Sequence, residues 1–348
     1  MRLALYAPLK PPGDPVPSGD RAMARNLLAA FGHMGALVDI PCTLRSRDGH
    51  GDSAVQAEIM AQADMLIPDI IAQGRNATWQ AWVTYHSYYK APDLIGPAVS
   101  RALGIPYLLI EATRARKRLG GQWDAFARTA EAACDAADAI FYLTERDHQA
   151  LAEYAPTGQK LIHLRPFLPQ ADLPSPAQGK TLLAVGMMRV AAKLPSYQLI
   201  AQVMALLPDT TQFEIAGDGP ARAQVEAAMA PVTDRVRFRG ALDPDALAAA
   251  YTRAAALIWP GVDEAFGMTY LEAQAHGLPV IAQDRAGLRD VLYPRTYPSV
   301  DAGAAGLATF AMAPAPARDD IRAYVAKYHL LPAAAATLRA GLSQVGVT

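Results

Sequence analysis

The chain has 348 residues, 52% of them hydrophobic, and its 32 basic and 33 acidic side chains leave a formal net charge of −1. This length and composition can bury two ordinary cores, so we expect two domains. The balanced charge excludes a strongly basic nucleic-acid-binding domain, and the two cysteines, Cys42 and Cys134, are too few for a disulfide framework or a metal cluster.

The N-terminal sequence, MRLALYAPLKPP, lacks the basic start, long apolar run and small-residue cleavage site of a secretory signal. Nowhere does the chain reach the roughly 18–20 consecutive apolar residues that a membrane-spanning helix needs. We therefore expect a cytoplasmic protein, in agreement with its sparse use of cysteine.

The first predicted elements are a strand, Leu3–Ala7, a loop rich in Pro and Gly, and a helix that starts near Arg21. A strand, a glycine-containing loop and a helix open the nucleotide-binding α/β folds. The loop lacks G-x-G-x-x-G because Gly13 and Gly19 are six residues apart. We therefore expect no dinucleotide cofactor.

Further short apolar runs alternate with helical segments, which predicts a parallel sheet covered by helices on both faces. Ligands of such sheets bind at the carboxyl ends of the strands. His86 and Glu111 each follow such a run directly and are therefore candidate site residues, although a lone histidine can equally be structural. The predicted strands are Leu66–Ile71, Trp82–Tyr85, Pro106–Ile110, Ala139–Leu143 and Leu161–Leu164.

The most basic segment of the chain follows Glu111 and precedes a predicted amphipathic helix with two aromatic residues. Two interpretations stay open for it. The cations could contact an anionic membrane surface, where each contributes about 1 kcal/mol, or they could form the solvated start of the helix. The four cations are Arg114, Arg116, Lys117 and Arg118.

A proline-rich segment, residues 166–179, has no periodicity and is predicted to link two domains, 1–168 and 169–348. In the second domain, predicted strands again lead into glycine turns, such as GDGP after Phe213–Ala216. The segment Asp243-Pro244-Asp245 has the form D-x-D. We interpret it as a helix N-cap followed by a proline at the first helical position, and we predict no catalytic metal there.

The stretch from Asp263 to Val291 contains two glutamates, Glu264 and Glu272, on either side of a glycine turn that runs into a short helix. Gly267 allows main-chain N–H groups to approach a ligand, and the helix N-terminus favours anions. In a fully helical span the two carboxylates would lie about 12 Å apart. A diphosphate with a sugar on each side fits this arrangement, whereas the alternative is two ordinary surface glutamates.

The segment EAFGMTYLE resembles the E-x7-E segment of family 4 of the retaining glycosyltransferases, which have the GT-B fold, and the likeness extends over most of the C-terminal half. The resemblance implies two Rossmann-like α/β domains whose parallel sheets face each other across a cleft. It also implies that the last helix crosses back to the first domain, and that no cofactor is needed besides a nucleoside-diphosphate sugar as the donor substrate.

The resemblance further implies roles for individual residues. Glu264 would lie beside the transferred sugar, Glu272 would bind the nucleotide ribose, and Lys193 and Arg189 would stabilise the leaving diphosphate. The remaining donor-binding positions would be Phe266, Gly267 and Met268 near the sugar and phosphates, Gly217 and Arg239 near the nucleotide, and Gly19 in the first loop.

Two departures from the family pattern concern the chemistry. Relatives often carry a histidine where this chain has Glu111, so the acceptor side rests on Glu111 or His86. Relatives also place an arginine directly after the glycine that corresponds to Gly186, whereas Arg189 stands two positions later. The sequence thus predicts a retaining, metal-independent glycosyltransferase whose acceptor is a glycan, a lipid or a small molecule. The same fold also serves nucleotide-sugar epimerases, and a binding protein with weakened turnover is a third interpretation.

Overall fold

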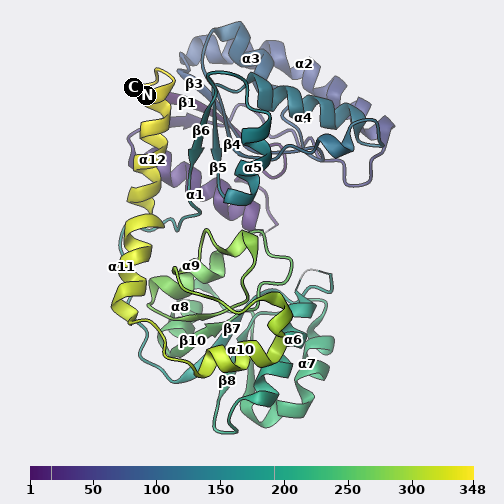
Figure 1. The fold of residues 1–348 in the computed structure, drawn as a ribbon. Helices are drawn as coiled ribbons and strands as arrows, with labels where there is room; N and C mark the ends of the chain where they lie inside the picture. The colour runs from purple at the N-terminus through teal and green to yellow at the C-terminus, as the bar shows by residue number, and fades with distance from the viewer. Residues whose placement is uncertain (17, 192) are drawn as a thin grey trace. The chain divides into compact units, whose positions relative to one another are not determined.

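In the computed structural model, which describes residues 1–16, 18–191 and 193–348, the chain divides into two compact units (Figure 1). Unit 1 comprises Met1–Arg165 and Leu331–Thr348, and unit 2 comprises Pro166–Leu330. The sequence placed this division at 168/169. The C-terminal segment belongs to unit 1, so the chain enters unit 2 once and leaves it once.

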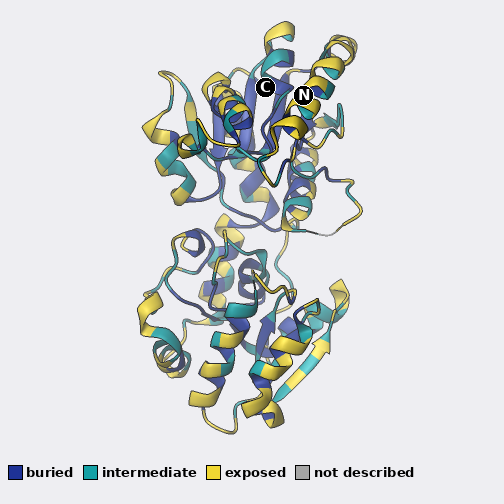
Figure 2. Ribbon diagram, turned by 90° about the vertical axis from the view of Figure 1, so that its right-hand side faces the viewer, coloured by how far each residue is buried: buried dark blue, intermediate teal, exposed yellow. Residues whose placement is uncertain are grey.

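Unit 1 contains a six-stranded parallel sheet in the order β2-β1-β3-β4-β5-β6. Its inner strands are mostly apolar and buried, as expected for a sheet covered by helices, and Figure 2 shows these strands as buried. The strands are β1 (Arg2–Tyr6), β2 (Leu37–Asp39), β3 (Ala81–Ser87), β4 (Tyr107–Ala112), β5 (Ala139–Tyr142) and β6 (Lys160–His163).

The helices of unit 1 form two groups, with α1 against α12 and with α2, α3 and α4 together. Their bounds are α1 (Gly19–His33), α2 (Ser53–Ala77), α3 (Gly96–Leu103), α4 (Asp124–Ala136), α5 (Glu145–Glu153) and α12 (Leu331–Gln344), and a 3-10 turn, η1 (Arg116–Arg118), precedes α4.

The strand predicted at Leu66–Ile71 is wrong, because these residues lie in the middle of the long helix α2. Asp52 caps this helix through two backbone N–H groups, and Pro68 lies within it. Ile70 is buried while Met65 is exposed, so the run has one buried face, as on a helix, rather than two buried faces, as on an inner strand. A short apolar run alone does not separate these two cases.

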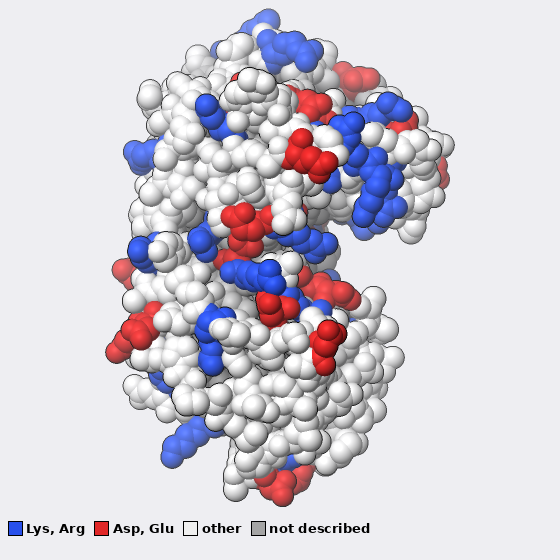
Figure 3. Space-filling model, viewed as in Figure 1, with Lys and Arg blue, Asp and Glu red and all other residues white. Residues whose placement is uncertain are grey.

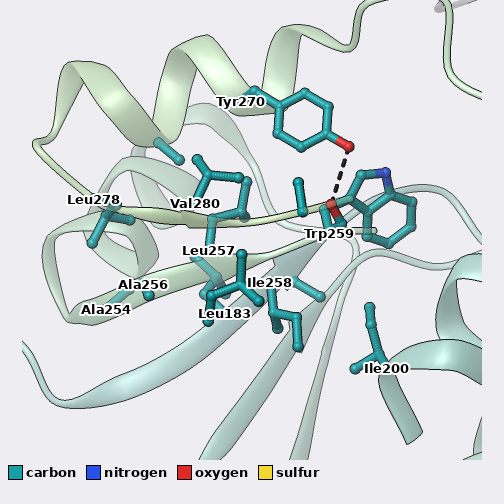
Figure 4. Close-up of a cluster of buried hydrophobic side chains, with 14 of the residues drawn as sticks. Leu183, Ile200, Ala254, Ala256, Leu257, Ile258, Trp259, Tyr270, Leu278 and Val280 are labelled. Carbon is teal, nitrogen blue, oxygen red and sulfur yellow. Dashed lines mark hydrogen bonds between the residues drawn. The ribbon is translucent and has the colours of Figure 1, made fainter. Parts of the chain in front are cut away.

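Unit 2 contains a five-stranded parallel sheet in the order β11-β10-β7-β8-β9. Helices pack around it, and Figure 4 shows part of its core, where Leu183, Leu257, Ile258 and Val280 meet. The strands are β7 (Thr181–Val185), β8 (Phe213–Ala216), β9 (Val236–Gly240), β10 (Ala254–Ile258) and β11 (Val280–Ile281). The helices are α6 (Leu194–Leu206), α7 (Arg222–Met229), α8 (Pro244–Thr252), α9 (Met268–Ala275), α10 (Gly303–Met312) and α11 (Arg318–Tyr328), with 3-10 turns η2 (Ala230–Arg235), η3 (Ala286–Leu288) and η4 (Val300–Ala302).

The proline-rich segment predicted as a linker packs on unit 2. The backbone N–H of Leu168 donates to the carbonyl oxygen of His329 at 2.8 Å, and that of Ala177 donates to the carbonyl of His276 at 2.8 Å. Both Leu168 and Ala177 are buried in the unit 2 core. The segment is therefore part of unit 2 and is held to it by backbone hydrogen bonds.

Each sheet has one point where the strand order reverses, and such points bind ligands in open α/β folds. In unit 1 the reversal lies between β1 and β3, and in unit 2 it lies between β7 and β10. The loops after β7 and β10 carry Arg189, Glu264 and Gly267, which the sequence singled out. Within the described residues, no helix combines the length and apolarity needed to cross a bilayer.

Candidate functional site

The unit 2 site begins at the reversal between β7 and β10. The loop after β7 carries Lys193, and the loop after β10 carries Glu264. The Lys193 ammonium forms an ion pair with Glu264 Oε1, and Trp259 Nε1 donates to the same oxygen at 2.9 Å. Because the side chains of Lys193 and Glu264 are only 22% and 11% exposed, this pair is partly shielded from water.

The glycine turn between Glu264 and α9 has the predicted form. Gly267 is the N-cap residue of α9 and has φ 72°, in the left-handed region, and no side chain caps the helix. A Cβ at this position would lie 2.8 Å from the ring of Tyr270. Phe266 and Met268, the other predicted donor-binding residues of the turn, are partly buried against the unit 2 core. The turn therefore requires glycine and leaves the start of α9 without a side-chain cap.

Tyr270 links this turn to the core of the unit. Its hydroxyl donates to the carbonyl oxygen of Trp259 at 3.1 Å, as Figure 4 shows. Trp259 in turn contacts Tyr197 of α6 edge-on, with ring centroids 5.0 Å apart. The residue that holds Glu264 is thus fixed by packing from α6 and α9.

Glu272 lies one helical turn beyond the start of α9, and its carboxylate accepts a hydrogen bond from the Tyr251 hydroxyl at 2.8 Å. Burial raises the pKa of Glu272, and the Tyr251 bond opposes this rise. Tyr251 stacks on His276 with ring centroids 5.3 Å apart. The second carboxylate of the E-x7-E segment therefore has a fixed orientation and a hydrogen-bond partner.

Three glycine-containing loops meet at the carboxyl ends of β7, β8 and β9. The N–H of Gly186 donates to Ala216 O at 3.0 Å, that of Gly217 to Gly240 O at 2.7 Å, and that of Met188 to Asp218 O at 2.9 Å. Gly217 has φ 144°, and a Cβ there would collide with the Gly186 carbonyl. Main-chain groups of these loops therefore come close to one another, and side chains are excluded from between them.

The side chains of two predicted cations contact partners other than Glu264. The Arg189 side chain is exposed, and its guanidinium contacts Met187 Sδ at 3.5 Å. Arg239, on β9, lies 3.8 Å from Glu214 of the neighbouring strand β8. The D-x-D segment does cap a helix, as predicted, since Asp243 Oδ1 accepts from Ala246 N at 2.8 Å.

The unit 1 site lies at the reversal between β1 and β3. His86 Nδ1 lies 3.0 Å from Asp20 Oδ1, and 3.9 Å from Glu111 Oε1. Asp20 is in the first turn of α1, directly after Gly19, and Ser18 caps this helix through Arg21 N at 3.2 Å. Both predicted acceptor-side residues therefore come together, and a second carboxylate joins them.

The backbone and the electrostatics of this cluster are unusual. His86 and Glu111 have φ 60° and 58°, which is strained for residues other than glycine and is concentrated at functional sites. Burial lowers the pKa of His86, but the carboxylates of Glu111 and Asp20 outweigh it, so this pKa is raised overall. Burial also raises the pKa of Glu111, against the effect of His86. In the described part of the chain, Glu111 Oε2 is buried without a hydrogen-bond partner.

The basic segment before α4 is not uniform. The Arg114 side chain is 1% exposed and forms ion pairs with Glu131 and Asp135 at 2.8 and 2.7 Å. It is therefore structural and is not a surface cation, which corrects the set predicted for membrane contact. Arg116 and Lys117 are exposed, and Arg118 is half-buried.

Sequence reasoning missed Asp20, Trp259 and Tyr251. An acid in the first turn of a helix is ordinarily explained by the helix dipole, and nothing in the sequence relates Asp20 to a histidine 66 positions away. Trp259 directly follows β10. His86 and Glu111 were selected because each directly follows an apolar run. The same criterion would select Trp259 if β10 had been predicted as a strand.

Residues 179–309 match the family model described as glycosyl transferases group 1. The chain is 29% identical over 226 residues to a 2-deoxystreptamine glucosyltransferase of Streptomyces kanamyceticus, covering 57% of this chain and 58% of that protein. It is also 29% identical over 238 residues to a D-inositol 3-phosphate glycosyltransferase of Frankia alni, covering 59% and 58%. The chain thus spans little more than half the length of these relatives.

The fold is similar to solved structures along its whole length. Sucrose-phosphate synthase from Thermosynechococcus elongatus matches with a TM-score of 0.69 at 17% identity, over 99% of this chain and 98% of that one. Anabaena Alr3699/HepE in complex with UDP matches with a TM-score of 0.70 at 13% identity, over 99% and 100%. These likenesses establish two parallel-sheet α/β domains of the GT-B type.

Proposed function

We propose that this protein transfers a sugar from a nucleoside-diphosphate sugar to an acceptor, because residues 179–309 match the group 1 glycosyltransferase model in a chain of GT-B fold. The observation that carries the proposal is the Lys193–Glu264 ion pair at the strand reversal of unit 2, beside the glycine turn that begins α9. The titles of the HepE complexes, which name UDP and UDP-glucose, support a donor of this chemical class.

The Lys193–Glu264 pair suits donor binding because each partner can be replaced by a group of the donor. The diphosphate offers Lys193 an anion in place of Glu264. The sugar hydroxyls offer Glu264 hydrogen-bond donors in place of the ammonium. Trp259 keeps its bond to Glu264 and holds the carboxylate during the exchange.

Lys193 then acts on the charge that develops as the sugar leaves. Negative charge grows on the diphosphate in the transition state, and a fixed cation in a partly shielded site stabilises it more than it stabilises the bound donor. The uncapped N-terminus of α9 at Gly267 contributes partial positive charge to the same region. Arg189 would contribute only after its side chain leaves Met187.

We assign Glu272 to the ribose, where it would accept hydrogen bonds from the hydroxyls. The Tyr251 bond fixes the carboxylate before the nucleotide arrives, so less ordering is needed on binding. We assign main-chain groups near Gly217 and Arg239 to the nucleotide and Gly19 to the phosphates. Gly19 begins α1 in unit 1, and a Cβ there would meet no atom within 4 Å.

We propose that transfer retains the anomeric configuration, with the leaving phosphate accepting the proton of the acceptor on the same face of the sugar. We also propose that no divalent metal is needed, since Lys193 and the α9 N-terminus supply the positive charge. On the acceptor side, His86 or Glu111 would bind the reacting hydroxyl. The acceptor would be a glycan, a lipid or a small molecule, and the free thiols of Cys42 and Cys134 suit a cytoplasmic location.

The alternatives predict different products. An epimerase of this fold would convert one nucleotide sugar into another without a second substrate. A binding protein with weakened turnover would bind the donor and release no nucleotide. Nucleotide release together with a glycosylated product supports transfer.

A panel of UDP, GDP, ADP and dTDP sugars in a thermal-shift assay identifies the donor first. A ligand at 100 times its dissociation constant stabilises the protein by about 2.7 kcal/mol. With that donor, nucleotide release is measured in excess EDTA and after addition of Mg²⁺ or Mn²⁺. We expect nearly the full rate in EDTA; loss of activity that a divalent ion restores would contradict the assignment of Lys193.

Peripheral contact with an anionic membrane is a second proposal. It rests on the exposed cations Arg116 and Lys117, because Arg114 is buried in an ion pair. Vesicles that contain phosphatidylglycerol should retain the protein at low salt and release it as salt increases. The double variant Arg116→Gln, Lys117→Gln should bind less. Equal binding of the parent and the double variant would exclude these residues.

A further inference from the structure

A second group of basic side chains lies beside aromatic rings in unit 1. Lys90 Nζ is 5.7 and 5.1 Å from the ring centroids of Tyr89 and Trp123, and Arg118 Cζ is 4.9 and 5.4 Å from the same two. The two rings meet edge-on at 5.5 Å. We call Tyr89, Lys90, Arg118 and Trp123 the Trp123 cluster. Figure 3 shows a group of Lys and Arg side chains on one side of unit 1, at the upper right of the view.

Two positive charges close to one pair of rings repel each other, and a nearby anion would offset this repulsion. Within the described residues, neither Lys90 nor Arg118 has an ion pair, whereas the acids of the same segment are engaged elsewhere. These acids are Asp124, bound to Arg128, and Glu131 and Asp135, bound to Arg114. Cation–π contacts stabilise each cation but do not cancel its charge.

The cluster also has hydrogen-bond donors without acceptors. In the part of the chain that the structure describes, Trp123 Nε1 and Arg118 Nε are buried and have no partner. The other three indole N–H groups donate to Asp39, Thr84 and Glu264. Buried donors without acceptors cost free energy, so a ligand, an ion or an ordered water normally supplies the acceptor.

A buried polar pair holds the cluster in place. Asp48, 3% exposed, donates its backbone N–H to Lys90 O at 3.0 Å. Asp48 Oδ2 also accepts at 2.8 Å from the amide of Gln56, which is 1% exposed. The same Gln56 amide donates to Gln122 O at 3.0 Å, next to Trp123. The chain segments that carry Lys90 and Trp123 are therefore tied to one buried centre.

We propose that the Trp123 cluster binds a phosphate group of the acceptor, which rests on the proposed transferase function. Two cations, one with the planar fork that matches phosphate, suit a doubly charged group better than a single carboxylate. The donor-binding residues assigned in unit 2 are not involved.

Aromatic contacts connect this cluster to the acceptor-side residues within unit 1. His86 lies 5.1 Å from Tyr88, Tyr88 lies 5.6 Å from Tyr89, and Tyr89 contacts Trp123, each between ring centroids. An acceptor could present its hydroxyl at His86 and Glu111 while its phosphate lies at the Trp123 cluster. Such an acceptor is extended, and its phosphate is remote from the hydroxyl that reacts.

The indole N–H signals of the ¹⁵N-labelled protein test the proposal without any turnover. Substitution Trp123→Phe assigns one of the four signals, and the protein is titrated with inorganic phosphate, with sodium chloride at matched ionic strength as the reference. We expect a saturable shift of the Trp123 signal with phosphate only. In the double variant Lys90→Gln, Arg118→Gln, the midpoint should rise at least tenfold, while Arg101→Gln, at an exposed arginine of α3, should leave it unchanged.

Vesicles of phosphatidylcholine with and without phosphatidylglycerol form a second arm. Saturation by free phosphate without vesicle binding assigns a soluble phosphorylated acceptor. Vesicle binding that requires Lys90 and Arg118, without saturation by free phosphate, assigns a lipid headgroup. If neither occurs, or if chloride or the double variant gives the same shift as the parent with phosphate, the site is refuted. Failure of nucleoside diphosphates to shift the Trp259 signal would instead contradict the proposed donor site.

Discussion

The Lys193–Glu264 pair joins two segments that we assign to the proposed donor site. The residues are 71 positions apart and meet because the loops after β7 and β10 are neighbours at the reversal of the sheet. In the pair each charge is balanced, so neither is held in a shielded site without a partner. Under the proposed function, donor binding would exchange these partners, and removal of either residue should affect transfer in a different way.

Lys193→Ala should lower the turnover number by about a hundredfold or more, because it removes a cation from the charge that develops on the leaving group. Nucleotide release under saturating donor measures this, and Lys180→Ala, at an exposed lysine just before β7, is the matched control. Activity within twofold of the parent would remove Lys193 from the site.

Glu272→Gln should mainly weaken donor binding, since a contact to the ribose is the same before and during transfer. Titration with the donor gives the affinity, and steady-state rates give the turnover number. Tyr251→Phe, which removes only the hydrogen bond to Glu272, should produce a smaller loss of the same kind. A reduced turnover number with unchanged affinity would contradict a role at the ribose.

His86 predicts a pH dependence of stability. Its pKa is raised in the folded protein, so the folded state binds more protons than the unfolded state above the unfolded value of about 6.5. The stabilisation is complete below that pH and is lost as pH rises through the folded pKa. Denaturant unfolding of the parent and of His86→Gln at pH 6 and pH 8.5 measures it, and the variant should lose less stability over this interval. An equal loss would mean that His86 does not carry the dependence.

At the level of single residues, the sequence predicts local geometry within a motif. Glu264, Gly267 and Glu272 lie in one short segment, and the turn and the helix form as predicted. Asp20 could not be found in this way, because it was singled out only by its contact with His86 of β3, 66 positions away. Arg114 was misjudged for the same reason: the acids that bury it lie on α4, 17 and 21 positions later.

Among the elements, α9 and its preceding turn are where we propose that the donor phosphates bind. Gly267→Ala should cost about 1 kcal/mol for the left-handed backbone and more for the contact with the Tyr270 ring. It should also weaken donor binding, since the turn must shift. Gly104→Ala is the control, because Gly104 has φ 65° and free space around a Cβ. Thermal unfolding and donor titration should separate the two variants; equal donor affinity for the parent and Gly267→Ala would contradict the assignment.

Strands that are buried on both faces could be predicted from the sequence. Elements that are buried on one face only were harder to predict. β3, β4 and β5 are buried apolar runs and were recognised as strands. The run within α2 is also rich in apolar residues, but these residues share one face of a 25-residue helix. Short strands such as β2, whose residues are exposed or only partly buried, carry too little pattern for recognition.

On the scale of the whole molecule, the C-terminal helix α12 completes unit 1 after the chain has passed through unit 2 (Figure 1). Arg339 donates to Met34 O at 3.0 Å, and Gly341 packs against Phe141 of β5 and Ile162 of β6. The resemblance implied such a crossing helix, but no residue of α12 predicts it by type. The apolar residues of α12 do not specify which of the two sheets the helix packs on.

Gly341→Val tests the place of α12. A Cβ at Gly341 would collide with the Phe141 ring and lie 2.8 Å from Ile162 Cδ1, so the larger side chain must displace α12 or distort β5 and β6. Overpacking of this kind costs about 1–3 kcal/mol. Hydrogen exchange followed by mass spectrometry should show faster exchange in α12, β5 and β6 and unchanged exchange in β7 and β10 of unit 2. Ala340→Val, at the exposed neighbouring position, should leave the exchange of both units unchanged.

Because unit 2 has its own sheet and core, a nucleoside diphosphate should still slow exchange around Lys193 and Glu264 in the Gly341→Val variant. Faster exchange throughout both units would mean that they unfold as one body and that α12 stabilises the whole chain.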